Sequence, residues 1–307
     1  LKGDKEFTCV PEGIAHFLEH KLFESEELDA FELFAKTGAN ANAFTSFDRT
    51  CYIFSCSKNF EKSLEILLDF VKKPYFTEQT VQKEQGIIGQ EIRMYQDDPD
   101  WQTLFNLLRG LYSKNPVRID IAGTIESIAE INAKLLYSCY NTFYNLSNMA
   151  LAVAGNVSVD EVLAIADKAL PKEEKVEFEQ IIPEEDDSVV TFYTEENLGV
   201  DMTKFALGFK DVSYAPLCTP KELVCVNLAL SIIAGKVSPL YCEMLEEGLI
   251  NQSFGTEYFT GRGFSAPIFT GESKEPKKVR DKIFAQIKRL IKDGISDEDF
   301  EVAKKRY

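Results

Sequence analysis

The chain contains only two histidines, and they lie four residues apart, at His16 and His20. Residues at i and i+4 share one face of an α-helix, so this spacing predicts a helix that presents both imidazoles to one point. Glu19 follows His16 by three residues and shares that face. The segment is an H-x-x-E-H motif, in which two imidazoles can bind one metal ion beside a carboxylate. A surface helix that carries two histidines by chance is the alternative interpretation.

A third metal ligand has to come from another residue type. A catalytic zinc ion takes three protein ligands and one open position, and no histidine remains. The seven cysteines include no C-x-x-C pair. Cys51 and Cys56 lie five apart in a strand-like stretch, so they are expected to face opposite sides of a sheet. Carboxylates are therefore the better source.

One segment, residues 78–95, carries two carboxylates in a suitable arrangement. Its apolar residues recur at helical spacing, which predicts a helix. Glu84 and Glu91 lie seven residues, or two turns, apart and therefore share a face. The alternative is an amphipathic helix whose glutamates are simply solvated, which is the usual state of this residue.

The histidine motif, followed some seventy residues later by this Glu-x6-Glu helix, resembles the pitrilysin family (inverzincins) of zinc metallopeptidases. That group includes insulin-degrading enzyme and mitochondrial processing peptidase. Three further segments resemble the family's N-A-F-T-S edge strand, its G-T-x-x-S-I turn and the strand that ends its catalytic domain, namely residues 38–46, 123–128 and 149–157. The motif at residues 13–21 is most similar to bacterial zinc peptidases of this group. The resemblance covers about residues 10–170, in the family's order.

The resemblance implies a role for each site residue. His16, His20 and Glu91 correspond to the ligands of one zinc ion per chain. Glu19 corresponds to the general base, and Glu84 to a second catalytic carboxylate that supports the site. The residue types suit this chemistry, because imidazole and carboxylate bind zinc and an unligated glutamate can take a proton from metal-activated water. The expected activity is hydrolysis of extended peptides by a zinc endopeptidase.

A peptide substrate needs a docking surface, and residues 42–54 are rich in β-branched and aromatic side chains, which predicts a strand. An exposed strand edge can accept an extended peptide as an additional strand through main-chain hydrogen bonds. In the resembled family this role belongs to the positions matched by Asn42, Ala43, Phe44 and Thr45. An ordinary core strand is the alternative.

The pattern of elements predicts an α+β fold. We expect two related domains, each a mixed, mostly antiparallel sheet with helices packed on one face, as in processing peptidases. The expected domains are a catalytic zinc-binding domain, 1–175, and a second, similar and truncated domain, 188–307, joined by a charged linker. Expected helices and strands are, in order, helices around 11–37, 58–72, 78–95, 100–112, 126–142, 158–169, 222–234, 240–247 and from 277, and strands over 43–55, 148–155, 189–193, 205–209 and up to 270.

Composition limits the partners and the compartment. The net charge of −16 argues against nucleic acid, whose binding requires concentrated Lys and Arg. No apolar run of about 18 residues is apparent, so we expect no membrane span. The odd number of cysteines, without a disulfide framework, suggests reduced thiols and a cytoplasmic location.

The second half departs from the resembled family, whose peptidases carry an Arg and a Tyr seven residues apart. The matching positions here hold Met244 and Asn251. Methionine donates no hydrogen bond, and asparagine lacks the reach of a phenol. Two alternatives follow: a non-catalytic binding or scaffold subunit, or a peptidase active only with a partner chain. Because family members enclose substrate between two halves, we expect a homodimer or a heterodimer with a related chain.

Overall fold

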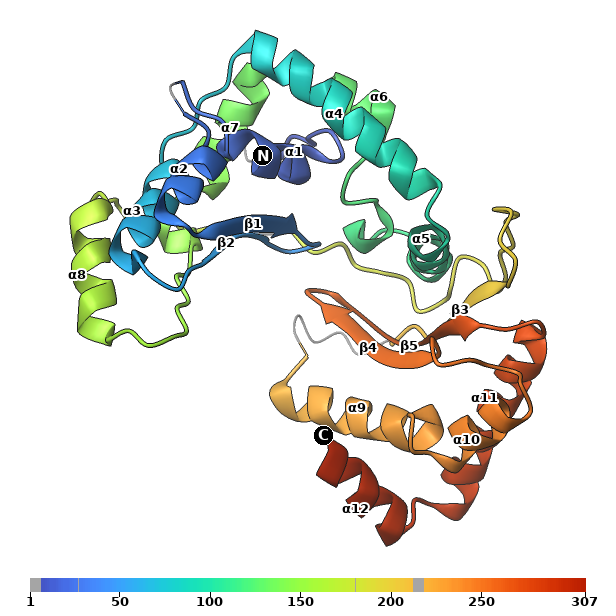
Figure 1. The fold of residues 1–307 in the computed structure, drawn as a ribbon. Helices are drawn as coiled ribbons and strands as arrows, with labels where there is room; N and C mark the ends of the chain where they lie inside the picture. Colours follow the sequence, from blue (N-terminus) through green and yellow to red (C-terminus); the bar gives the residue numbers. More distant parts are fainter. Residues whose placement is uncertain (1–6, 27, 180, 212–217) are drawn as a thin grey trace. The chain divides into compact units, whose positions relative to one another are not determined.

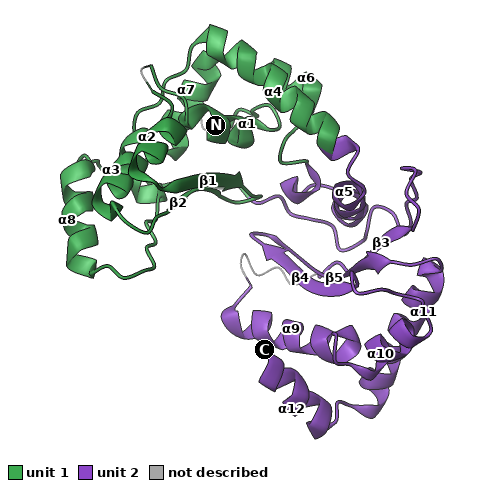
Figure 2. Cartoon of the chain, viewed as in Figure 1, with its two compact units in different colours: residues 1–94, 120–181 green, residues 95–119, 182–307 purple. Residues whose placement is uncertain are grey.

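The computed structural model describes residues 7–26, 28–179, 181–211 and 218–307. The chain divides into two compact units (Figure 2). Unit 1 comprises residues 1–94 and 120–181, and unit 2 comprises residues 95–119 and 182–307. Each unit combines helices with a small antiparallel sheet (Figure 1), so the α+β class is confirmed. The predicted domain limits at 175 and 188 stay a prediction.

Unit 1 contains a β-hairpin with helices α1 (Ile14–Leu22), α2 (Ala30–Thr37) and α3 (Phe60–Phe70) packed against it. β1 (Asn40–Thr45) pairs antiparallel with β2 (Thr50–Ser55), and within the described residues it pairs with no other strand. The other helices of this unit are α4 (Glu78–Gln96, as far as residue 94), α6 (Ile125–Ala129), α7 (Ala133–Phe143) and α8 (Val159–Ala169), with a 3-10 turn, η2, at Leu146–Asn148.

The histidine helix α1 is a core helix rather than a surface one. Ile14, Phe17, Leu18 and Leu22 recur at helical spacing and are all buried. The loop before α1 is held by a close approach at Gly13, where φ is +86° and an added Cβ would lie 2.4 Å from the Ala122 carbonyl oxygen. Only glycine satisfies both conditions, so the backbone at the start of α1 is firmly placed.

Unit 2 is built on a three-stranded antiparallel sheet in the order β3 (Lys204–Gly208), β5 (Phe264–Glu272), β4 (Gly255–Gly261). Its core combines apolar residues of the sheet with those of the helices, including Leu230, Met244, Tyr258, Phe269 and Ile283. The helices are α5 (Pro99–Leu111), α9 (Pro220–Ala234), α10 (Pro239–Glu246), α11 (Pro276–Asp293) and α12 (Asp297–Arg306), with a 3-10 turn, η1, at Pro116–Arg118.

Three expected strands differ from the structure. The strand expected over 43–55 is a hairpin, because residues 46–49 turn the chain and the Ser46 N–H donates to the Arg49 carbonyl at 2.8 Å. The strands expected over 148–155 and 189–193 are wrong. A strand requires a hydrogen-bonded neighbour, and no strand within the described ranges pairs with either segment. At 189–193 the N–H groups of Val190 and Thr191 instead donate to the Gly110 carbonyl.

The expectation that no stretch could span a membrane also needs correction. By length and composition alone, Pro220–Glu246 is long and apolar enough to do so. In the structure this stretch is two helices, α9 and α10, and both contribute buried side chains such as Leu230 and Leu240 to the core of unit 2.

Carboxylates of the charged linker bond to residues 113–115 of unit 2, and Glu185 makes most of these bonds. Glu185 accepts hydrogen bonds from three successive backbone N–H groups, those of Ser113, Lys114 and Asn115, at 2.6–2.8 Å. Lys210 adds an ion pair at 3.2 Å. Burial alone would raise the pKa of Glu185, but these hydrogen bonds outweigh it and lower the pKa to about 2.

We therefore expect Glu185→Gln to destabilise unit 2. The free energy of unfolding of the variant should also change less with pH in the acid range. The pKa of Glu185 in the folded protein lies below the unfolded value of 4.5, so the stabilisation is present above about pH 4.5 and is lost as pH falls towards 2. After allowance for solvent screening it amounts to roughly 2 kcal/mol. Denaturant unfolding between pH 2 and 7 measures it. Glu184→Gln, at the exposed neighbouring position, is the control, and equal stability of the two variants would contradict the role of Glu185.

Candidate metal centre

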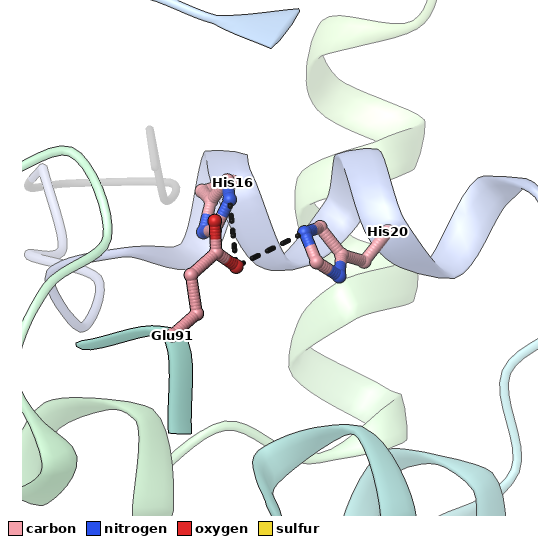
Figure 3. Close-up of side chains that lie close together, drawn as sticks. All are labelled: His16, His20 and Glu91. Carbon is pink, nitrogen blue, oxygen red and sulfur yellow. Dashed lines mark ion pairs between the residues drawn. The ribbon is translucent and has the colours of Figure 1, made fainter. Parts of the chain in front are cut away.

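Helices α1 and α4 bring the predicted metal ligands together. Glu91 Oε2 lies 3.6 Å from His16 Nε2 and 3.5 Å from His20 Nε2 (Figure 3). One ligand atom from each of the three residues can be chosen so that all lie within 4.8 Å of one another. The arrangement therefore has two imidazoles from one helix facing a carboxylate from another.

These distances fit a zinc ion. Zinc–ligand bonds of 2.0–2.2 Å in a tetrahedron place neighbouring ligand atoms about 3.4 Å apart, close to both separations from Glu91. Two imidazoles and one carboxylate are a donor set that zinc accepts at catalytic sites. The side chains of His20 and Glu91 keep 26% and 23% of their surface exposed, so a metal ion held here would be accessible to water.

Glu84 approaches the same histidine from its other ring nitrogen. Its Oε1 lies 3.0 Å from His20 Nδ1. A proton on Nδ1 that is donated to Glu84 leaves the lone pair of Nε2 directed towards Glu91, so this contact selects the tautomer suited to metal binding. Glu84 is thus placed to support the site rather than to complete it. The corresponding atom of His16, Nδ1, is buried and has no hydrogen-bond partner among the described residues.

The two imidazoles differ electrostatically. Burial lowers the pKa of His16, and the nearby charge of His20 lowers it further, so His16 favours the neutral form that binds metal. For His20, burial acts in the same direction, but the hydrogen bond and charge of Glu84 outweigh it and raise the pKa. A metal ion bound here would therefore displace a proton from His20 more often than from His16, and its affinity would depend on pH.

Glu19 lies on α1 between the two histidines and is only 8% exposed. Its Oε2 accepts a hydrogen bond from Thr45 Oγ1 at 2.5 Å. Burial raises the pKa of Glu19, while the Thr45 hydrogen bond and the charge of His20 act against this rise. A carboxyl group whose pKa is raised towards neutral pH is suited to accept and return a proton.

The predicted substrate-binding residues all lie on β1. Asn42 and Phe44 are exposed, whereas Ala43 and Thr45 alternate with them and are half-buried. The Ala43 N–H donates to the Asn42 side-chain oxygen at 2.9 Å. Of these four residues, Thr45 reaches the candidate metal centre through its hydrogen bond to Glu19.

Met244 and Asn251 are both used inside unit 2. Met244 is fully buried in its hydrophobic core. The Asn251 amide donates to Glu272 at 2.7 Å and accepts from Ser253. Neither side chain is therefore placed as a donor for a substrate.

Sequence reasoning did not find the hydroxyl groups that hydrogen bonds link to Thr45, directly or through one another, those of Thr50, Tyr144 and Tyr52. Thr50 Oγ1 lies 3.2 Å from Thr45 Oγ1, and the hydroxyls of Tyr52 and Tyr144 are 2.8 Å apart. A signal did exist: with a loop at 46–49 recognised as a turn, strand alternation places Thr45 opposite Thr50. Nothing in the local pattern points to Tyr144, which lies 92 residues from Tyr52.

Comparisons with known proteins cover nearly the whole chain and indicate one family. The family model described as Insulinase (Peptidase family M16) matches residues 10–125, and that described as Peptidase M16 inactive domain matches residues 130–307. An uncharacterized zinc protease of Bacillus subtilis, YmfH, is 42% identical over 311 residues, covering 99% of this chain and 72% of the relative. The mitochondrial-processing peptidase subunit beta of Bos taurus is 32% identical over 160 residues, covering 50% of this chain and 32% of the relative. A crystal structure of an M16-like peptidase from Alicyclobacillus acidocaldarius superimposes with a TM-score of 0.94 at 35% identity, covering 99% of this chain and 73% of that one.

Proposed function

Because this chain belongs to the M16 (pitrilysin) family of zinc peptidases, as its motifs predicted, we propose that it is a zinc-dependent endopeptidase. The observation that carries the proposal is the convergence of His16, His20 and Glu91, with Glu19 beside them on α1. In this arrangement three residues can bind the metal, and a fourth, Glu19, is a carboxylate that does not. Peptide hydrolysis by activated water requires both kinds of group.

The residues of the chain have distinct tasks in this proposal. His16, His20 and Glu91 would hold zinc, which when bound acidifies water and polarises a carbonyl group. Glu19 accepts the proton of the attacking water and passes it to the leaving amine. Glu84 keeps His20 in the tautomer that binds metal, through the 3.0 Å contact with Nδ1.

The outer edge of β1 is the proposed docking site for an extended peptide. Main-chain pairing at an edge strand accepts many side chains, which suits an endopeptidase acting on unfolded segments. The Ala43 N–H is already engaged by the Asn42 side chain, so a peptide carbonyl would have to take the place of that amide oxygen. In the absence of substrate, the Asn42 side chain thus provides the hydrogen-bond acceptor for the Ala43 N–H at the strand edge.

We further propose that the protein works as a homodimer or with a related chain. Met244 is buried and Asn251 is bonded to Glu272, so the donors that family peptidases provide from these positions would come from another chain. One relative is by its name a subunit. The second candidate function, a non-catalytic scaffold subunit, is favoured by the same two residues.

One experiment tests both proposals. Purified protein is assayed for zinc content, cleavage of extended peptides and solution mass, alone and mixed with a related chain that lacks the zinc motif. We expect about one zinc per chain, cleavage that a chelator abolishes and zinc restores, and the mass of a dimer. Full activity as a monomer would exclude the need for a partner. Bound zinc without cleavage in either sample would favour the scaffold function.

A further inference from the structure

The hydroxyl of Thr45 is committed to Glu19 rather than left free for a substrate. Its Oγ1 lies 2.5 Å from Glu19 Oε2, a short contact of the kind that hydroxyls make with carboxylates. Thr45 is half-buried, and Glu19 is only 8% exposed, so water competes poorly for this bond. A carboxylate held by one oxygen loses most of its freedom to rotate.

A second hydroxyl determines the direction of this bond. Thr45 Oγ1 also lies 3.2 Å from Thr50 Oγ1. A threonine hydroxyl has one proton, and an ionised Glu19 can only accept, so the proton of Thr45 goes to Glu19. For this contact Thr50 then has to be the donor, and the Tyr144 hydroxyl, which also forms a hydrogen bond with Thr50, has to donate to Thr50 in turn. The result is a chain of two hydroxyls whose protons both point towards the carboxylate.

The hairpin holds this chain in place. Thr45 and Thr50 are directly opposite each other in the register of β1 and β2, as the last pair before the turn. The turn is closed by the bond from the Ser46 N–H to the Arg49 carbonyl. Because side chains of directly opposed residues lie close together, the backbone register sets the separation of the two hydroxyls.

We propose that Thr45 is a positioning residue, which fixes the Glu19 carboxylate for proton transfer with Thr50 as the donor behind it. Oε2 is occupied by Thr45, which leaves Oε1 as the oxygen that handles the proton. The inference rests on the proposed peptidase function, and it assigns the Thr45 side chain to the base rather than to the substrate. Because Thr45 ends the strand proposed to pair with peptide, one hairpin orients both the base and the substrate.

The test compares Thr45→Val with Thr45→Ser. Valine keeps the β-branched shape of threonine and removes the hydroxyl, whereas serine keeps the hydroxyl. We expect Thr45→Val to lower kcat by about ten-fold, as the loss of one hydrogen bond to a charged group implies, with KM and zinc content close to wild type. Thr45→Ser should recover most of kcat. Thr260→Val on β4 is the matched control, because it makes the same change in unit 2.

Crystal structures of the wild type and both variants give a readout that does not depend on activity. Glu19 should occupy one conformer in the wild type and in Thr45→Ser, and several in Thr45→Val. A rise in KM with unchanged kcat would return Thr45 to substrate binding and overturn the proposal. Equal loss in Thr45→Ser and Thr45→Val would overturn it as well. If the wild type cleaves no peptide, the proposed function fails, and the conformers of Glu19 still decide whether Thr45 positions it.

Discussion

Glu19→Gln is expected to retain zinc and to lower peptide turnover by roughly 10² or more. Glutamine has nearly the same size and shape, and its carbonyl oxygen can still accept the hydrogen bond from Thr45. It cannot accept a proton from water, so the step that generates the nucleophile loses its base. The proposed metal ligands are other residues, and zinc content should therefore stay near one per chain.

Zinc content and steady-state cleavage of one peptide, measured on the same preparation, check this result. Glu32→Gln is the control, because it removes an equal charge from an exposed position on α2 in the same unit. Near-normal turnover in Glu19→Gln would remove Glu19 from its role as base. Loss of zinc in this variant would instead indicate that Glu19 belongs to the metal ligands.

His20→Ala is expected to abolish stable zinc binding, with affinity falling by more than about 100-fold, since loss of even a supporting group can cost that much. Two of the three ligands would remain, and two ligands seldom hold zinc in water. The substitution also removes the partner of Glu84, whose Oε1 lies 3.0 Å from His20 Nδ1. Titration with a competing chelator measures the affinity, and turnover should disappear with the metal.

Glu19→Gln is the matched control for His20→Ala, because it changes the adjacent residue of α1 and should keep zinc. A His20→Ala protein that retains zinc fully would contradict the assignment of the metal centre. Glu91→Gln and Glu84→Gln then identify the third ligand. We expect the larger loss in Glu91→Gln, because Glu91 Oε2 faces both histidines at 3.5–3.6 Å, whereas Glu84 faces only His20.

Most helices of the fold followed from sequence. The expected helices over 58–72, 78–95 and 158–169 appear as α3, α4 and α8, with no end shifted by more than two residues. Helical periodicity is a local property, so side chains three and four residues apart reveal it without reference to the rest of the chain.

The strands were predicted less well, because a strand depends on its neighbours. Residues 148–155 have the composition of a strand, yet no strand of the described chain pairs with them. The hairpin at 40–55 needed recognition of a turn at 46–49, which apolar patterning does not mark.

The sequence by itself determined which residues share a helix face. His16, Glu19 and His20 are one turn apart, and Glu84 and Glu91 are two turns apart, so their common faces follow from 3.6 residues per turn. The tertiary structure alone decided what those faces meet. It placed Glu91 Oε2 between the two histidines, Glu84 on the far nitrogen of His20 and Thr45 on Glu19. These contacts join residues 26 to 75 positions apart, and they are set by the packing of α1 against its neighbours, which spacing along the chain does not encode.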